Sequence, residues 1–133
     1  MSVYEEPFEW VKESIDSILN QTYPDIEFII ILDNPNNINL NLKIKNYIKN
    51  NTKAIILHNE KNIGLARSLN RGIEYSTGDY IARMDADDIS NVIRIEKQIK
   101  FLQHNKDISL VGSNMEKIDE SGSGFGVMAL PSD

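Results

Sequence analysis

The stretch that decides the fold is Ile26-Glu-Phe-Ile-Ile-Ile-Leu32, and Asp33-Asn-Pro-Asn-Asn37 follows it directly. The first part is a short β-branched run whose lack of alternation predicts a strand covered on both faces. The second part is rich in Asn and Pro and predicts a turn. Because strands buried on both faces occur mainly in parallel sheets covered by helices, the run predicts an α/β protein.

Helical and extended patterns alternate along the rest of the chain. We expect strands at residues 26–32, 54–58, 79–84 and 108–114, and residues 2–4 as the end of a strand whose beginning is absent. Apolar residues at helical spacing predict helices at residues 8–21, 40–48, 64–75 and 93–105. This alternation predicts βαβ units, so we expect an α/β fold with a central, mostly parallel sheet flanked by helices.

Composition narrows the class of protein. The chain has 133 residues, which suits a single domain over residues 1–133. Its 14 basic and 20 acidic side chains give a net charge of −6, which argues against a nucleic-acid partner. The absence of cysteine excludes a disulfide scaffold, a thiol nucleophile and a thiolate zinc site. The longest apolar run, Phe28–Leu32, is too short to span a bilayer and no signal peptide is visible, so we expect a cytoplasmic location.

The sharpest motif is Met84-Asp-Ala-Asp-Asp88, in which three carboxylates directly follow an expected strand. Carboxylates this close repel one another unless they are solvated or hold a cation, and Mg²⁺ binds one or two carboxylates together with phosphates and waters. The alternative is an acidic helix N-terminus, where Asp residues complement the helix dipole. An EF-hand is rejected because Ile89 and Ser90 stand where its loop needs a ligand and a glycine.

Two further candidates follow from the position of strand ends. Ligands of open parallel sheets bind beyond the carboxyl ends of the strands, where we expect Tyr4 and Asp33. Asp33 could accept a hydrogen bond from a ligand N–H, or it could form an Asx-turn or cap the next helix. Tyr4 could stack on a base, or it could be an ordinary half-buried strand end. The loop 59–64 leads into an expected helix N-terminus and could approach an anion, although it has no glycine-rich phosphate motif.

Six short segments, taken together and in order, resemble the family 2 glycosyltransferases of GT-A fold. They are Tyr4-Glu-Glu, Ser17-Ile-Leu-Asn-Gln-Thr-Tyr23, Asn62-Ile-Gly64, Leu69-Asn-Arg-Gly-Ile73, Gly78-Asp-Tyr-Ile81 and Met84-Asp-Ala-Asp-Asp-Ile-Ser90. The resemblance implies transfer of a sugar, with inversion, from a nucleotide diphosphate donor to an acceptor hydroxyl. We expect a UDP-sugar as donor and a saccharide or lipid-linked acceptor, in the synthesis of a cell-surface polysaccharide or glycoconjugate.

The resemblance also implies roles for individual residues. Nucleotide binding falls to Ser2, Tyr4, Asp33 and Asp85: Tyr4 stacks near the base with Ser2 beside it, and Asp33 contacts the base. Asp85 and Asp87 are the first and last acidic residues of the DxD motif. Asp85 lies near the ribose and the metal, and Asp87 coordinates the divalent metal, Mn²⁺ or Mg²⁺, that bridges the diphosphate.

The chain departs from the family pattern in sequence and in length. Glu5 stands where an Asn is usual, Leu32 replaces the first of two Asp residues, and Val92 stands where a Pro is common. The family's general base lies downstream of the acidic motif, so we expect it beyond Asp133 and expect this chain to be the nucleotide-sugar-binding part of a longer enzyme, inactive alone. The alternatives are a nucleotidyltransferase and a non-catalytic nucleotide-binding module. Association with the inner face of a membrane, through parts outside this chain, is left open.

Overall fold

The computed structural model describes residues 1–130, so the predicted domain boundary at Asp133 lies outside the described residues. The chain forms two compact units, Met1–Ile95 and the residues from Glu96 onward. Each unit is described by itself.

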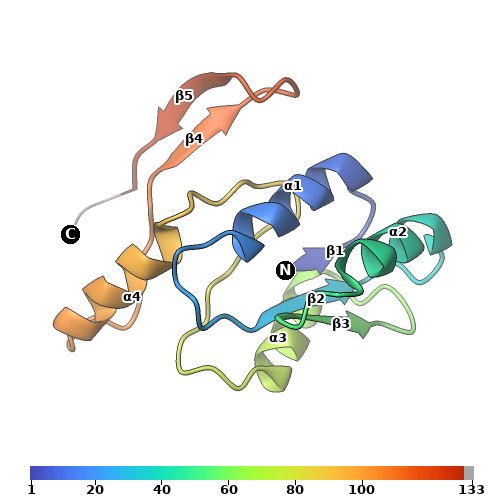
Figure 1. The fold of residues 1–133 in the computed structure, drawn as a ribbon, viewed down its shortest axis with the longest axis horizontal. Coiled ribbons are helices and arrows are strands. Elements are labelled where there is room, and N and C mark those ends of the chain that lie inside the picture. Colours follow the sequence, from blue (N-terminus) through green and yellow to red (C-terminus); the bar gives the residue numbers. More distant parts are fainter. Residues whose placement is uncertain (131–133) are drawn as a thin grey trace. The chain divides into compact units, whose positions relative to one another are not determined.

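The first unit is built on a three-stranded parallel sheet (Figure 1). Its strands are β1 (Ser2–Val3), β2 (Phe28–Leu32) and β3 (Ala54–His58), in the order β1-β2-β3. Ser2 pairs with Ile31, and Phe28 pairs with Ala54. The expected strands at 26–32 and 54–58 and the parallel sheet are therefore confirmed, and all three strands end at the same edge.

Helices cover both faces of this sheet, as the unalternating sequence of β2 predicts. Helices α1 (Phe8–Leu19) and α2 (Ile38–Ile48) lie on one face, and α3 (Leu65–Tyr75) lies on the other (Figure 1). Alternate residues of β2 serve the two sides: Ile30 and Leu32 belong to the core formed with α1 and α2, while Ile31 faces Gly72 of α3. The buried core on the α1 and α2 side comprises Met1, Val3, Val11, Ile15, Ile18, Phe28, Ile30, Leu32, Leu40, Ile44, Ile48, Met84 and Ala86.

Two of the expected strands are wrong. Residues 79–84 form no strand. Consistent with this, Tyr80 and Ile81 are 42% and 55% exposed. Residues 108–114 also form no strand, and Leu110 is 87% exposed, so this apolar run is not buried. A β-branched run becomes a strand only where a neighbouring strand takes up its backbone groups.

The second unit contains most of α4 (Arg94–His104) and a hairpin of β4 (Met115–Ile118) and β5 (Gly124–Met128). The two strands pair antiparallel, with an irregularity after Lys117. Asp119 holds the turn between them by accepting hydrogen bonds from the amides of Ser121 and Ser123. Among the described residues, no helix is both long and apolar enough to span a bilayer.

Candidate functional site

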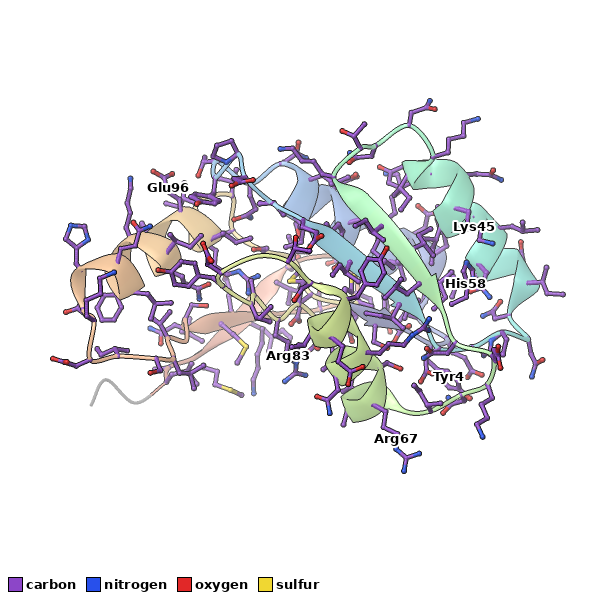
Figure 2. The ribbon with its side chains drawn as sticks, turned by 90° about the horizontal axis from the view of Figure 1, so that it is seen from below. Tyr4, Lys45, His58, Arg67, Arg83 and Glu96 are labelled. Atoms are coloured by element: carbon purple, nitrogen blue, oxygen red, sulfur yellow. The ribbon has the colours of Figure 1, made fainter. Side chains whose placement is uncertain are left out.

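A pocket of about 280 Å³ opens at the edge of the sheet where the strands end. Ser2 and Tyr4 contribute from β1 and the residue after it, and Asp33 contributes from the end of β2. Figure 2 shows Tyr4 beside the loop that follows β3. The complete lining is Ser2, Tyr4, Glu6, Asp33, Asn62, Gly64 and Leu65. The pocket thus unites three of the four predicted nucleotide-binding residues, whereas Asp85 does not line it.

Asp33 is 2% exposed and forms one wall of the pocket. Its Oδ1 accepts hydrogen bonds from Asn59 Nδ2 at 2.7 Å and from the Ile63 amide at 2.9 Å. Its Oδ2 accepts a bond from the Gly64 amide at 2.9 Å. Amides at the N-terminus of a helix lack backbone partners and can bind an anion. Here the anion that they bind is the Asp33 carboxylate. Asp33 does not cap α2, whose N-cap is Asn37.

The hydrogen bonds determine the charge state of Asp33. Burial raises the pKa of this carboxyl group, because loss of water disfavours the charged form. Bonds from Ile63, Asn59, Gly64 and Ser68 oppose burial, and together they bring the pKa below the ordinary value of 3.8. Asp33 is therefore an ionised carboxylate at neutral pH.

Two polar side chains support Asp33 from behind. Asn59 Nδ2 also donates to Ser68 Oγ at 2.8 Å, which ties the residue after β3 to the buried side of α3. Arg71 donates to the Asn59 side-chain oxygen and to the His58 carbonyl, which fixes the orientation of the Asn59 amide. The wall of the pocket is therefore a continuous hydrogen-bonded network that links β2, β3 and α3.

The acidic segment Asp85–Asp88 lies apart from the pocket lining. Arg83 Nη2 contacts both carboxylate oxygens of Asp85 at 2.9 Å, and this pair is exposed. The pKa of the Asp88 carboxyl is raised, first by loss of hydration and then by repulsion from Asp85 and Asp87. Because α4 begins only at Arg94, the segment does not lie in the first turn of a helix, and the alternative of a dipole-complementing helix N-terminus is wrong.

A divalent cation suits this donor set. No group of three metal-ligating side chains occurs among the residues that the structure describes, but Mg²⁺ needs only one or two carboxylates when phosphates complete its shell. The repulsion that raises the pKa of Asp88 is the kind of strain that a bound cation relieves. The exposed Arg83–Asp85 pair is worth about 0–1 kcal/mol, so it would be a weak competitor for a cation.

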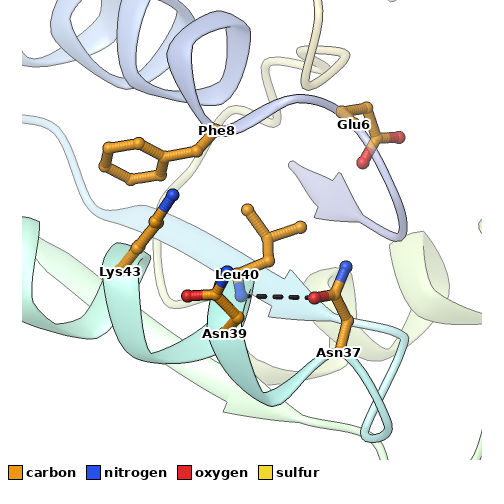
Figure 3. Close-up of a pocket in the computed structure, with 6 residues that line it drawn as sticks. All are labelled: Glu6, Phe8, Asn37, Asn39, Leu40 and Lys43. Atoms are coloured by element: carbon orange, nitrogen blue, oxygen red, sulfur yellow. Dashed lines mark hydrogen bonds between the residues drawn. The ribbon is translucent and has the colours of Figure 1, made fainter.

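A second pocket of about 190 Å³ lies between the start of α1 and the start of α2 (Figure 3). Its polar lining includes Glu6, which it shares with the first pocket, and Asn37, whose side chain accepts a bond from the Leu40 amide. Lys43 stands over the ring of Phe8 at 5.4 Å. Asn37 and Lys43 are engaged with other residues of the lining, and we assign no separate site to this pocket.

Sequence reasoning missed several residues of the site. Glu6 and Leu65 line the first pocket, and the Asn59–Arg71 pair supports it. The one signal available was Gly64 ahead of a helical pattern: its φ of 83° is a conformation that favours glycine, and it turns the chain so that its amide meets Asp33.

Comparison with protein families gives a match over nearly the whole chain. The model described as "Glycosyl transferase family 2" matches residues 1–128. An uncharacterized glycosyltransferase of Methanocaldococcus jannaschii is 46% identical over 123 residues, which is 92% of this chain and 42% of that protein. The O-antigen biosynthesis glycosyltransferase WbnJ of Escherichia coli is 38% identical over 115 residues, covering 86% of this chain and 44% of that protein. The chain therefore spans less than half the length of these relatives.

Comparison with solved structures gives the same fold. The mannosyltransferase PcManGT of Pyrobaculum calidifontis, solved with GDP-Man and Mn²⁺, superposes with a TM-score of 0.68 at 19% identity. The match covers 76% of this chain and 30% of that one. At this identity the likeness establishes the fold, and the predicted GT-A architecture is confirmed.

Proposed function

Because the chain belongs to glycosyl transferase family 2, we propose that it binds the donor of a glycosyl transfer reaction, a nucleotide diphosphate sugar. The complete protein would move the sugar to an acceptor hydroxyl with inversion, in the synthesis of a cell-surface polysaccharide or glycoconjugate. The name of the O-antigen relative supports this context. The domain over residues 1–133 would supply donor binding, and the acceptor side would lie in a further part.

The donor's base is proposed to occupy the pocket between Tyr4 and Gly64. Tyr4 lines the pocket and is 42% exposed, so its ring is partly accessible for stacking, which is worth about 1–3 kcal/mol per base. Ser2 lies beside it in the lining. Uracil is the proposed base, and a UDP-sugar the proposed donor.

Asp33 can serve that base in two ways. The first is a direct hydrogen bond from uracil N3–H. The second is indirect: the carboxylate fixes the amides of Ile63 and Gly64 and so shapes the wall that the base contacts. The four protein donors that lower the pKa of Asp33 leave little acceptor capacity, which favours the indirect role.

Asp85 and Asp87 are proposed to hold a divalent cation, Mn²⁺ or Mg²⁺, with Asp85 also near the ribose. When bound, the cation would neutralise charge on the leaving diphosphate, as a Lewis acid. The side chains of this chain would hold the diphosphate end of the donor in place. An acceptor hydroxyl would then attack the anomeric carbon in line while a carboxylate takes its proton. We propose that this base lies beyond Asp133, in keeping with the chain's 42% share of its Methanocaldococcus relative.

The observation that carries the proposal is the joint lining of one pocket by Ser2, Tyr4 and Asp33. Calorimetry of the chain with UDP, CDP and GDP, each with and without Mn²⁺, tests it. We expect UDP to bind most tightly, and to bind more tightly with Mn²⁺. In Asp87→Asn the effect of Mn²⁺ should disappear, while metal-free binding persists. Asp25→Asn, an exposed carboxylate elsewhere, is the matched control.

Three outcomes would contradict parts of the proposal. Tighter binding of GDP than of UDP would reject uracil as the base. An undiminished Mn²⁺ effect in Asp87→Asn would remove that residue from the metal site. Sugar transfer by residues 1–133 alone would show that the general base is present in this chain after all.

A further inference from the structure

Three polar side chains form a stripe along α1 and just past its end: Ser14, Ser17 and Gln21. Their spacing of three and four residues places them on one side of the helix. The stripe interrupts an otherwise apolar buried face, since Ser14 is 0% and Gln21 is 8% exposed. Buried polar groups are costly unless they are paired, so the partners of this polar stripe indicate its role.

The partners lie in the segment that carries the acidic motif, in the helix itself and, for one contact of Ser14 Oγ at 3.4 Å, at Met1 Sδ. Ser14 Oγ donates to the Asp85 carbonyl at 3.0 Å. Ser17 Oγ accepts a bond from the Ser90 amide at 3.0 Å. These two bonds fix the backbone at the first of the three carboxylate residues and two positions after the last.

Gln21 fixes the far end of the segment. Its side-chain amide nitrogen, Nε2, donates to the Asn91 carbonyl at 2.8 Å and to Ser90 Oγ at 3.2 Å. Its Oε1 accepts a bond from the Ile95 amide at 3.0 Å. The polar stripe therefore holds residues 85–95 at both ends while leaving the side chains of Asp85 and Asp87 unconstrained by these bonds.

We propose that Ser14, Ser17 and Gln21 are positioning residues for the metal-binding segment, an inference that rests on the proposed function. The two carboxylates are separated by one residue and belong to no helix or strand. Neither regular structure nor a helix cap fixes their spacing. Burial of Met84 and Ala86 anchors the segment in the core, and the bonds from α1 fix its backbone at Asp85 and Ser90. Through that backbone the polar stripe sets the positions from which Asp85 and Asp87 meet a cation and the diphosphate.

Ser17→Ala gives the sharpest test, because Ser17 is only partly buried and its loss creates a small change in volume. Calorimetry would compare UDP binding by the wild type and the variant, with and without Mn²⁺. We expect the gain in UDP affinity from Mn²⁺ to fall roughly two- to tenfold, the range of one net hydrogen bond, while metal-free affinity stays unchanged. Ser17→Thr keeps the hydroxyl and should restore the gain.

Ser17 Oγ also donates to the Ser14 carbonyl at 2.7 Å. Ser76→Ala is the matched control, since it removes a similar bond, from Ser76 Oγ to the Ile73 carbonyl at 2.7 Å, at the C-terminal end of α3. A second readout does not depend on nucleotide. Hydrogen exchange of the Ser90 amide should accelerate in Ser17→Ala, return to the wild-type rate in Ser17→Thr and remain slow in Ser76→Ala.

The results separate this inference from the proposed function. If the wild type gains UDP affinity with Mn²⁺ and Ser17→Ala keeps the full gain, the positioning role is overturned. Equal loss of metal-free and metal-bound affinity would also overturn it, because that pattern reports a general loss of structure. If the wild type shows no Mn²⁺ effect, the proposed function fails, and the exchange rates still decide whether the polar stripe holds the segment.

Discussion

Asp33 is a single residue whose charge is tied to the fold around it. Its pKa is lowered in the folded chain, so its ionised form stabilises the fold at pH values above the unfolded value of 3.8. That contribution is lost as the pH falls through the folded-state pKa, where both states bind the proton. We therefore predict that Asp33→Asn lowers stability at pH 7 and that its difference from the wild type shrinks in acid.

Thermal unfolding of both proteins from pH 7 down to pH 3 measures this difference, with Asp25→Asn as an exposed control. A difference that is constant over the whole range would mean that the charge of Asp33 is not what the network needs. The same variant separates the two roles of Asp33 in binding. Loss of the preference for UDP over CDP indicates a direct bond to the base, whereas equal weakening of both indicates the indirect role.

Gly64 has a backbone conformation that residues other than glycine rarely adopt. Its φ of 83° and ψ of 161° belong to a region that is almost restricted to glycine. An added Cβ would meet no atom within 4 Å, so the cost of Gly64→Ala is backbone strain alone. We predict a loss of about 1–3 kcal/mol in the free energy of unfolding, measured with urea. Gly78→Ala, at an ordinary φ, should cost less, and an equal cost would contradict the strain argument.

The role of Asp33 shows what sequence reasoning reaches at this scale. Its position at the end of a buried strand placed it correctly at the carboxyl edge of the sheet. Its partners could not be predicted, because Asn59, Ile63 and Gly64 are remote in sequence and no local pattern records which loop a carboxylate will meet. The loop was predicted to suit an anion, and the anion that it holds is Asp33.

Among the elements, α3 and β2 approach each other closely at Gly72. A Cβ on this residue would lie 3.0 Å from Ile31 Cδ1, tighter than ordinary contact. Overpacking against Ile31 opposes the gain of about 1 kcal/mol in helix propensity, so we predict that Gly72→Ala destabilises the fold by up to about 2 kcal/mol. Ile31→Val removes the opposing methyl and should itself cost about 0.5–1.5 kcal/mol, because Ile31 is 1% exposed.

The double variant distinguishes overpacking from other causes. If Cδ1 is the obstacle, Gly72→Ala in the Ile31→Val background should cost less than in the wild type. Urea unfolding of all four proteins gives this coupling energy. Strict additivity would show that Gly72 is required for a reason other than its distance from Ile31.

The helices were predictable to within a few residues because each carries an apolar stripe of its own. Strands depend on a neighbouring strand, and only some of the predicted strands were correct. Residues 26–32 were recognised because β2 is covered on both sides, but residues 79–84, with fewer β-branched side chains, remain outside the sheet. The difference lies in whether a neighbouring strand pairs with the segment, which a local pattern cannot reveal.

At the scale of the whole molecule, the residues predicted to bind the nucleotide and the metal all lie in one of the two units. Ser2, Tyr4, Asp33, Asp85 and Asp87 all belong to the unit Met1–Ile95. We therefore predict that a chain lacking residues 106–130 and the three that follow, but keeping α4, binds UDP with Mn²⁺ as tightly as the full chain. Calorimetry of the two proteins checks this, and circular dichroism confirms that the shortened chain is folded. Weaker binding by a folded shortened chain would assign part of the site to the second unit.

The β4–β5 hairpin has a practical consequence for work in solution. Each strand pairs with a single neighbour among the described residues, so one edge of each is open, and Phe125 and Val127 are 68% and 71% exposed. Open edges with apolar side chains are templates for pairing between molecules, and the chain should scatter light increasingly as it is concentrated. Lysine on an edge strand blocks such pairing, so Val127→Lys should keep concentrated samples clear while leaving nucleotide affinity unchanged.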